Sequence, residues 1–426
     1  MVTVTPARVT ALQIMRAIRS GELADRAFVR LVTEVSARER AWLHELVYGT
    51  LRLRGRIDYI LGQFVKRGVA KLDADVHDIL RLGVYQLLEM HSVPAYAAIS
   101  QMVELTKKSG VKSASGFVNG VLQSLQRGRD KLERDAEEWT SHPRWLLERW
   151  RREFGWEETL RLTAANNARP ELYIRPIGIT AADAARILAE QGIDAQTLPS
   201  APDALHIASD SAVTAVLEAV PAIVQDPAAG LVTRYADLNG VVADICAAPG
   251  GKAIAIAAQL ESGAVVASDI SAQRMQRLSE NVARLPGLPL HVVVADGRCP
   301  VVKSCDGVLL DAPCTGTGTF KRHPDGKWRI QPHDLKALAT LQRSLLDAAA
   351  AIVKPGGVLV YSTCSLEPEE NVLQIENFLE RQNGAFALAA PSSWHDETQL
   401  TPDGLLLMLP QRHGFDGAFA ARMVRV

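Results

Sequence analysis

The chain has 426 residues, of which 47% are hydrophobic and 22% are charged, and its formal net charge is −1. This length exceeds what one hydrophobic core normally organises, so we expect two or three domains, and the composition excludes a disordered or fibrous protein. No apolar run reaches the roughly 18 residues that span a bilayer, and the N-terminus is typical of an amphipathic helix rather than a secretory signal. We therefore expect a cytoplasmic protein that makes no contact with membranes.

The small net charge conceals an uneven distribution. Residues 1–130 hold 19 Lys and Arg against 12 Asp and Glu, whereas the remainder is acidic overall. A basic N-terminal third joined to a mildly acidic remainder indicates one module that binds a polyanion and another with a different task. A solvated helical surface without a partner would carry the same charge, so this feature alone does not decide between the two.

Five cysteines stand at positions 246, 299, 305, 314 and 364. Their odd number and wide spacing argue against a disulfide framework. No C-x-x-C pair or Cys/His cluster has the spacing of a zinc site, so we expect no metal. Each thiol is therefore either a small buried side chain or part of the chemistry, and we assign the buried structural role to Cys246, Cys299 and Cys305.

Residues 1–130 carry apolar side chains at helical spacing, as in AWLHELVYGTLRLRGRIDYILGQF and VHDILRLGVYQLLEM. No segment alternates in the manner of a strand. This region is predicted to be an all-α domain of six or seven helices. Residues 131–170 are charged, rich in Trp and also helical, which is typical of a connector.

Residues 171–235 predict a small α+β subdomain, because LYIRPI and ALHIAS have the character of strands and AADAARILAEQG that of a helix. From 236 to 426 the apolar runs VVADIC, AVVASD, LHVVVAD, DGVLLD and GVLVYSTC occur, most of them separated by helical segments. This pattern indicates a Rossmann-like α/β domain, an open parallel sheet that binds ligands at the C-terminal ends of its strands. The last segment, LLLMLP to AARMVRV, is predicted to form an antiparallel hairpin on one edge of the sheet.

The first of these strands runs into DICAAPGGK, residues 244–252, and a helix follows. Gly250 and Gly251 permit a tight turn and a close approach of the backbone to a ligand at the helix N-terminus. The sequence is not a P-loop, because Ala253 follows Lys252 and the first glycine is missing, and it lacks the G-x-G-x-x-G pattern of dinucleotide sites. The turn therefore indicates a nucleoside ligand without a pyrophosphate.

Two further acids end the next strands. Asp269 is placed to accept hydrogen bonds from both ribose hydroxyls, and Asp296 is placed to reach the exocyclic amine of an adenine. Taken singly, each acid would more simply be a helix N-cap, but acids at successive strand ends favour a cofactor site. S-adenosylmethionine is the nucleoside cofactor that fits this combination.

Two thiols follow later strands: Cys314 in DAPC and Cys364 in YSTCS. A thiol at a strand end suits the methylation of carbon 5 of a pyrimidine, since that carbon becomes nucleophilic only after a thiolate adds to carbon 6. An acid that forms a hydrogen bond with ring nitrogen 3 would ease the addition, a role for Asp311. A base must then remove the carbon-5 proton before the enzyme is released.

The motifs DICAAPGGK, DAPCTGTGTFKRHPDGKWR and YSTCSLEPEEN closely resemble those of bacterial ribosomal RNA cytosine-5 methyltransferases. The stretches RERAWLHELVYGTLRLRGRIDYIL, VPAYAAISQMVELTK and GFVNGVLQSL are similar to the NusB-type RNA-binding domain found on one branch, the RsmB/Sun type that acts on small-subunit RNA. The resemblance therefore covers nearly the whole chain.

This resemblance implies that Cys364 attacks carbon 6, that Cys314 assists release of the methylated RNA, and that the target is cytosine 967 of 16S rRNA. It also implies that the following residues contact the cofactor or line its pocket: Cys246, Ala247, Ala248, Pro249, Gly250, Gly251, Lys252, Asp269, Asp296 and Asp311.

Two positions depart from the family pattern. Gly326 stands where a larger apolar residue is commoner in HPD-x-KW, and Ala418 replaces an aromatic residue in the terminal strand. Neither belongs to the proposed catalytic groups. The basic residues of KRHPDGKWR are expected to hold RNA phosphates; they are Lys321, Arg322, Lys327 and Arg329. Trp328 either lies near a flipped-out base or packs in the core.

The sequence thus predicts a monomeric, S-adenosylmethionine-dependent enzyme that forms 5-methylcytosine in 16S ribosomal RNA, with the helical domain docking the RNA. Two alternatives remain open. One is a tRNA or another ribosomal position as substrate, which the appended helical domain disfavours. The other is a non-catalytic RNA-binding assembly factor, which the intact Cys364, Cys314, Asp311 and cofactor turn disfavour.

Overall fold

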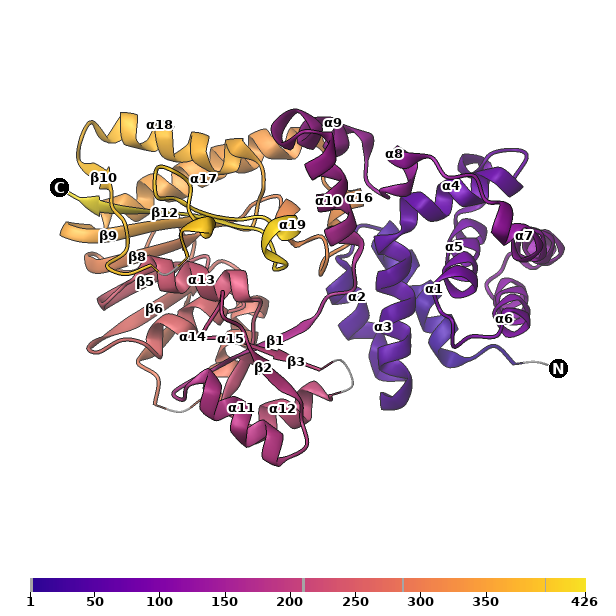
Figure 1. The fold of residues 1–426 in the computed structure, drawn as a ribbon, viewed down its shortest axis with the longest axis horizontal. Coiled ribbons are helices and arrows are strands. Elements are labelled where there is room, and N and C mark those ends of the chain that lie inside the picture. Colours follow the sequence, from indigo (N-terminus) through magenta and orange to yellow (C-terminus); the bar gives the residue numbers. More distant parts are fainter. Residues whose placement is uncertain (1–2, 209–210, 286, 395) are drawn as a thin grey trace. The chain divides into compact units, whose positions relative to one another are not determined.

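The computed structural model describes residues 3–208, 211–285, 287–394 and 396–426. The chain forms two compact units, each of which Figure 1 shows in the colours of the sequence. The helical unit comprises Met1–Arg169 together with Phe320–Arg329, and the sheet unit comprises Pro170–Thr319 and Ile330–Val426. The predicted fold class is confirmed, since an all-α part, a small α+β part and a Rossmann-like α/β part follow one another along the chain.

The helical unit begins with seven α-helices, in agreement with the apolar spacing. They are α1 (Pro6–Arg19), α2 (Ala24–Leu31), α3 (Ala37–Arg52), α4 (Arg54–Phe64), α5 (Ala74–Leu88), α6 (Ala95–Lys108) and α7 (Ser115–Gly128). Three more helices follow, namely α8 (Ala136–Trp139), α9 (Arg144–Phe154) and α10 (Trp156–Asn167).

Helix α5 forms the centre of this unit. Asp73 caps its N-terminus by accepting hydrogen bonds from the backbone N–H groups of Asp75 and Val76. Nearly every residue from Val76 to Leu87 is buried, which is expected of a helix surrounded by others. Helix α3 approaches α5 closely at Gly49, because a Cβ there would lie only 2.0 Å from the ring of Tyr85.

The last part of the helical unit comes from a distant part of the chain. Phe320 is 1% exposed, and its ring centroid lies 6.2 Å from that of Trp150 on α9. The short helix α16 (Gly326–Arg329) follows. Trp328 Nε1 donates a hydrogen bond to the carbonyl of Leu51 at 2.8 Å. The motif that begins at Asp311 in the sheet unit therefore ends inside the core of the helical unit.

The sheet unit begins with a four-stranded antiparallel sheet in the order β2-β3-β1-β4. Its strands are β1 (Leu172–Pro176), β2 (Ala195–Thr197), β3 (Leu205–Ile207) and β4 (Ala222–Val224), and its helices are α11 (Ala181–Glu190) and α12 (Val213–Ala219). Two of these strands, β2 and β4, were not predicted from the sequence.

The second sheet has eight strands in the order β10-β12-β9-β8-β5-β6-β7, with β11 also paired to β12. Five strands are parallel and match the predicted runs: β5 (Gly240–Ile245), β6 (Gly263–Asp269), β7 (Leu290–Val294), β8 (Cys305–Asp311) and β9 (Val353–Thr363). Three are antiparallel: β10 (Phe386–Leu388), β11 (Leu406–Met408) and β12 (Ala418–Arg425).

Helices cover both faces of this sheet. Alternate residues of β9 enter different cores: Val360 packs in the core that includes α13 (Pro227–Ala236), α14 (Gly251–Ala257) and α15 (Ala272–Ala283). Leu359 and Tyr361 pack in the core that includes α17 (Pro332–Ala351) and α18 (Val372–Gln382). The sheet carries its functional residues at one edge, between these two layers.

The predicted C-terminal hairpin on one edge of the sheet is confirmed. Strands β11 and β12 do pair antiparallel, with Leu406 opposite Ala420. A further short strand, β10, also pairs with β12, through Phe386 and Arg425, and was not predicted. A three-residue strand such as β10 has no recognisable period and was therefore missed.

Candidate active site

The predicted site residues gather at the C-terminal ends of the parallel strands. In spatial order along the sheet, Cys364 follows β9, Asp311 ends β8, Cys246 follows β5 and Asp269 ends β6. Asp296 lies two residues beyond β7, at the far side of the same edge. One sheet edge thus brings together residues that are up to 118 positions apart in the sequence.

The turn after β5 is shaped by two residues with left-handed backbone conformations. Cys246 has a φ of 63° and Gly250 a φ of 100°. A side chain at Gly250 would meet Leu278 of α15, whose Cδ1 would lie 2.0 Å from the added Cβ. The glycine therefore allows α14 to begin at Gly251 directly beside the strand end. Burial, followed by the nearby carboxylates, raises the pKa of the Cys246 thiol to about 12, so this cysteine stays protonated.

Asp244 is a site residue to which the sequence analysis assigned no role. It lies near the end of β5 and is 0% exposed, and neither carboxyl oxygen has a hydrogen-bond partner within the described parts of the chain. Burial, with Asp311 as a second cause, raises the pKa of this carboxyl well above its usual range. An orphaned buried acid beside a ligand-binding turn suits a ligand that brings a cationic or amine donor. Its position at the start of DICAAPGGK was the available signal.

The two acids predicted to bind a nucleoside are both engaged by neighbouring groups. Asp269 is 3% exposed, accepts a hydrogen bond from the N–H of Ser271 at 2.9 Å and pairs with Arg274 at 3.2 Å. Asp296 pairs with Arg298 at 2.5 Å, and this hydrogen bonding lowers the pKa of Asp296 to about 2. Asp296 is therefore held as a carboxylate, the form that accepts hydrogen bonds from hydroxyls or amines.

Asp311 forms the polar centre of the site. Lys252 Nζ donates to Asp311 Oδ2 at 2.7 Å, and Ser362 Oγ donates to Asp311 Oδ1 at 2.8 Å. Burial lowers the pKa of Lys252, but the charge of Asp311 and the hydrogen bond to it outweigh this effect, so the net shift is upward. The lysine thus remains an ammonium and keeps a proton beside the acid.

The two strand-end cysteines form a close pair. Cys314 Sγ and Cys364 Sγ lie 3.4 Å apart, and both cysteines are of intermediate exposure and in no disulfide. The hydrogen bond with Cys364, then burial, raises the pKa of Cys314 well above its usual range. A negative charge on Cys364 is also one of the causes that raise the pKa of Lys252. The arrangement therefore keeps Cys314 a protonated thiol beside the sulfur of Cys364.

The prediction for the remaining cysteines is half right. Cys305 is 0% exposed, and burial raises its pKa to about 11, which agrees with a structural thiol. Cys299, by contrast, is exposed, so its assignment as a buried side chain is wrong. It follows β7 in a loop rather than inside a strand, where burial would be expected.

The basic residues predicted to hold RNA divide into two groups. Lys321 and Arg322 are of intermediate exposure and Arg329 is exposed. Lys327 is 0% exposed, and its Nζ donates to the carbonyl of Arg52 at 2.8 Å and to Asn167 Oδ1 at 2.9 Å. The predicted RNA contact of Lys327 is therefore wrong, because its side-chain nitrogen is buried and donates its hydrogen bonds within the helical unit.

Trp328, for which the sequence left two roles open, is half-buried and bonded to Leu51 in the same unit. The guanidinium of Arg54 lies over its ring, 5.3 Å from the centroid. These contacts favour the core role for Trp328.

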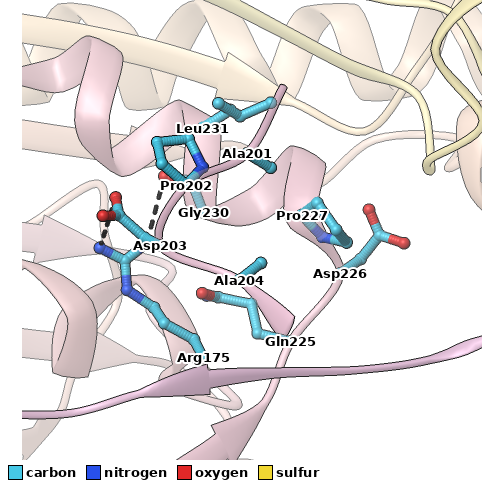
Figure 2. Close-up of a pocket in the computed structure, with 10 residues that line it drawn as sticks. All are labelled: Arg175, Ala201, Pro202, Asp203, Ala204, Gln225, Asp226, Pro227, Gly230 and Leu231. Carbon is cyan, nitrogen blue, oxygen red and sulfur yellow. Dashed lines mark hydrogen bonds and ion pairs between the residues drawn. The ribbon is translucent and has the colours of Figure 1, made fainter. Parts of the chain in front are cut away.

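A separate small cavity lies between the small sheet and α13 (Figure 2). Arg175 pairs there with Asp203 at 3.4 Å. The cavity has a volume of about 10 Å³, which is room for one water rather than for a nucleoside.

In the described residues, no three or more His, Cys, Asp and Glu side chains are arranged to hold a metal ion. No helix described here is long and apolar enough to cross a bilayer.

Comparison with known proteins assigns the family. The chain is 34% identical to the ribosomal RNA small subunit methyltransferase B of Erwinia tasmaniensis, over 98% of each chain. The probable enzyme of the same name from Synechocystis sp. is also 34% identical, with 98% of this chain and 99% of the relative covered. The family model described as 16S rRNA methyltransferase RsmB/F matches residues 236–424. The chain belongs to this family.

Other family models match the rest of the chain. The NusB family model covers residues 5–127, and the ferredoxin-like domain model of RsmF/B-like methyltransferases covers 142–214. Among solved structures, the crystal structure of PH0851 has a TM-score of 0.81 and 27% identity, with 99% of each chain covered. A structure of NSun6 from Pyrococcus horikoshii, solved with SFG, has a TM-score of 0.57 over 67% of this chain and 98% of that one. At 21% identity this second likeness supports the fold alone.

Proposed function

We propose that this RsmB/F family member transfers a methyl group from S-adenosylmethionine to carbon 5 of a cytosine in 16S rRNA, with cytosine 967 as the target. The observation that carries the proposal is the pair of sulfur atoms 3.4 Å apart, Cys314 Sγ and Cys364 Sγ, at the same sheet edge as Asp311. Carbon-5 methylation needs one thiolate that adds to the ring and one base that later removes a proton, and this pair offers both.

The turn 246–252, Asp269 and Asp296 are the groups that would hold the cofactor. The carboxyl of Asp244, which has no hydrogen-bond partner among the described residues, supports this fit, because a cofactor with an amino group would bring the donors that this carboxyl lacks. When bound, S-adenosylmethionine supplies an electrophilic methyl group on a sulfonium sulfur. The protein's task is then to make carbon 5 of the cytosine nucleophilic.

In the first step, the Cys364 thiolate forms a bond to carbon 6, and the electron pair of the carbon 5–carbon 6 double bond moves toward carbon 5 and ring nitrogen 3. Lys252 Nζ and Asp311 Oδ2 lie 2.7 Å apart. The proton between them neutralises the charge that develops on nitrogen 3. Carbon 5 then takes up the methyl group and becomes tetrahedral, while Cys364 remains bound to carbon 6 as a neutral thioether.

Release follows from the changed charge of the thiol pair. The hydrogen bond with Cys364 is the largest cause of the raised pKa of Cys314, and the charge of Cys364 acts in the same direction. Once the Cys364 sulfur is bonded to carbon, both effects end and the pKa of Cys314 falls. Cys314 then gives its proton to solvent, and the resulting thiolate takes the proton from carbon 5. The double bond reforms, the bond between carbon 6 and sulfur breaks to return the Cys364 thiolate, and nitrogen 3 returns its proton to the Lys252–Asp311 pair.

RNA docking is assigned to the basic residues of the helical unit, including Lys321, Arg322 and Arg329, because exposed cations contact phosphates without sequence preference. The NusB family match over residues 5–127 supports this role. We further propose that the enzyme acts in the cytoplasm as a monomer.

The test is methylation of a 16S rRNA transcript by the purified protein with S-adenosylmethionine. Bisulfite sequencing should reveal one new 5-methylcytosine, at position 967. Methylation of tRNA instead, or at another ribosomal position, would overturn the assigned target. No methylation of any RNA would favour a non-catalytic role in assembly.

A further inference from the structure

Two neighbouring residues, Glu370 and Asn371, connect the two cysteine-bearing loops. They end the motif YSTCSLEPEEN and lie just before α18. Glu370 is 0% exposed and Asn371 is 4% exposed. A carboxyl and an amide buried to this extent are stable only with hydrogen-bond partners, and the partners of both are found next to the cysteines.

Glu370 holds the backbone on the two sides of Cys314. The N–H of Thr315 donates to Glu370 Oε1 at 3.0 Å, and the Thr315 hydroxyl donates to Glu370 Oε2. On the other side, Gln342 Nε2 of α17 donates both to the carbonyl of Pro313 and to Glu370 Oε1, each at 2.9 Å. The residues before and after Cys314 are therefore fixed by one buried carboxyl and the amide bound to it.

Asn371 has the corresponding contacts around Cys364. Thr363 Oγ1 donates to Asn371 Oδ1 at 2.6 Å, and Asn371 Nδ2 donates to the carbonyl of Ser365 at 2.9 Å. The N–H of Ser365 also donates to Thr363 Oγ1 at 3.2 Å. The residues that flank Cys364 are thus fixed by the side chain that follows Glu370.

Direct bonds fix the spacing between the two loops. The N–H of Gly318 donates to the carbonyl of Cys364 at 2.9 Å, and the N–H of Leu366 donates to Thr317 Oγ1 at 2.8 Å. A Cβ on Gly318 would lie 2.8 Å from the carbonyl oxygen of Cys364, so the loops are in close contact. Because the two loops are bound to each other, the orientation of each thiol depends on the side chain that binds the residues on either side of it. That side chain is Glu370 for Cys314 and Asn371 for Cys364.

We propose that Glu370 and Asn371 are positioning residues with separate tasks, Glu370 for the release step of Cys314 and Asn371 for the attack of Cys364. The inference rests on the proposed function, since it uses the roles given there to the two thiols. A displacement of about 1 Å in a reacting group can slow a step about 100-fold. Because the two residues are adjacent and equally buried, a merely structural role would give both the same phenotype, whereas positioning gives opposite ones.

The experiment follows the covalent protein–RNA complex on a denaturing gel and the methylated product in parallel, with full-length protein, 16S rRNA transcript and S-adenosylmethionine. Asn371→Ala should slow adduct formation and methylation together, by about 10- to 100-fold, and leave little adduct. Glu370→Ala should form the adduct at the normal rate and slow its release by a similar factor, so that the complex accumulates as it does in Cys314→Ser.

Two further variants and one control distinguish positioning from a loss of folding. Glu370→Gln keeps an acceptor for the N–H of Thr315, and its amide can donate to the Thr315 hydroxyl, so it should restore release. Gln342→Ala removes only the bond to Pro313 and its link to Glu370, and it should accumulate the adduct if Glu370→Ala does not fold. Glu376→Ala, an exposed position on α18, is the matched control and should behave as the unmodified protein.

The outcomes separate this inference from the proposed function. Loss of the adduct in both Glu370→Ala and Asn371→Ala would overturn the separate tasks. So would normal release in Glu370→Ala while Cys314→Ser accumulates the complex. If Cys314→Ser itself accumulates no complex, the release role of Cys314 fails, and with it the proposed function on which the inference depends.

Discussion

One continuous motif, DAPCTGTGTFKRHPDGKWR, is divided between the two units of the molecule. Its first part, residues 311–319, belongs to the sheet unit and holds an acid and a thiol at a ligand-binding edge. Its second part, Phe320–Arg329, belongs to the helical unit, where Phe320 and Lys327 are almost fully buried. The first part is proposed to act in chemistry, whereas the buried residues of the second stabilise a core. Burial and hydrogen-bond partners, rather than membership of a motif, distinguish these tasks.

The largest expected effect concerns the thiol proposed to attack the ring. Cys364→Ala should lower the rate of methylation by at least about 10⁴-fold, because no other group adds to carbon 6. The measurement is transfer of labelled methyl groups to 16S rRNA, with cofactor binding by calorimetry expected to be unchanged. Cys299→Ala, at an exposed loop position, is the matched control. Substantial activity in Cys364→Ala would refute the nucleophile role.

The next effect concerns the first part of the divided motif. Cys314→Ser should lower turnover by about 100-fold, since a hydroxyl is a poor base for the carbon-5 proton. The covalent protein–RNA complex should persist, which a gel shift under denaturing conditions detects. Turnover at the normal rate would show that Cys314 takes no part in the reaction and that the motif holds no catalytic thiol.

The second part of the motif offers a test through pH. Burial, then Arg52 and Arg56, lowers the pKa of Lys327 well below its usual value in the folded protein. The unfolded chain, with a lysine pKa near about 10.4, therefore binds more protons, and this residue makes the free energy of unfolding rise with pH up to that value. Lys327→Met removes this contribution but leaves the carbonyl of Arg52 and Asn167 Oδ1 unpaired, which costs about 1–3 kcal/mol.

Urea unfolding between pH 7 and pH 10 measures the difference. The difference in the free energy of unfolding, native protein minus Lys327→Met, should increase as the pH rises. Lys321→Met, at a half-exposed position of the same segment, is the matched control. A difference that stays constant or shrinks with pH would contradict the buried role of Lys327.

The smallest effects are expected at the accessible cations of the same segment. Lys321→Ala, Arg322→Ala and Arg329→Ala should each weaken RNA binding. Each should also reduce the slope of log affinity against log salt by about 0.7 to 0.9, the contribution of one phosphate contact. Filter binding at several salt concentrations measures this slope. The kcat at saturating RNA should be unchanged. An unchanged slope in all three variants would show that this segment does not contact RNA.

Much of the fold follows from periodicity in the sequence. Seven helices lie in residues 6–128, and the five parallel strands are apolar runs. Strands β5, β6, β8 and β9 are largely buried, whereas the edge strand β7 is only partly buried. Strand β10 was missed because three residues carry no period. The order of the strands depends on long-range pairing, which no local pattern contains.

The site was predictable where it depends on residues at strand ends. Cys364, Asp311 and Asp269 lie at one sheet edge, as parallel topology requires. The burial of Lys327 was not predictable, since a lysine in a run of basic residues is normally solvated and only the fold supplies the carbonyl of Arg52 and the amide of Asn167. The unpartnered state of Asp244 likewise depends on neighbours that the sequence does not place.

The central claim is that Cys364 attacks the ring and Cys314 releases it. The most direct measurement uses the unmodified protein with S-adenosylmethionine and a 16S rRNA transcript that contains 5-fluorocytosine. A base cannot remove fluorine from carbon 5 as it removes a proton, so the adduct should be trapped after methyl transfer. Mass spectrometry of the digested complex should then place the nucleotide on Cys364. A nucleotide on Cys314, or no adduct at all, would contradict the account.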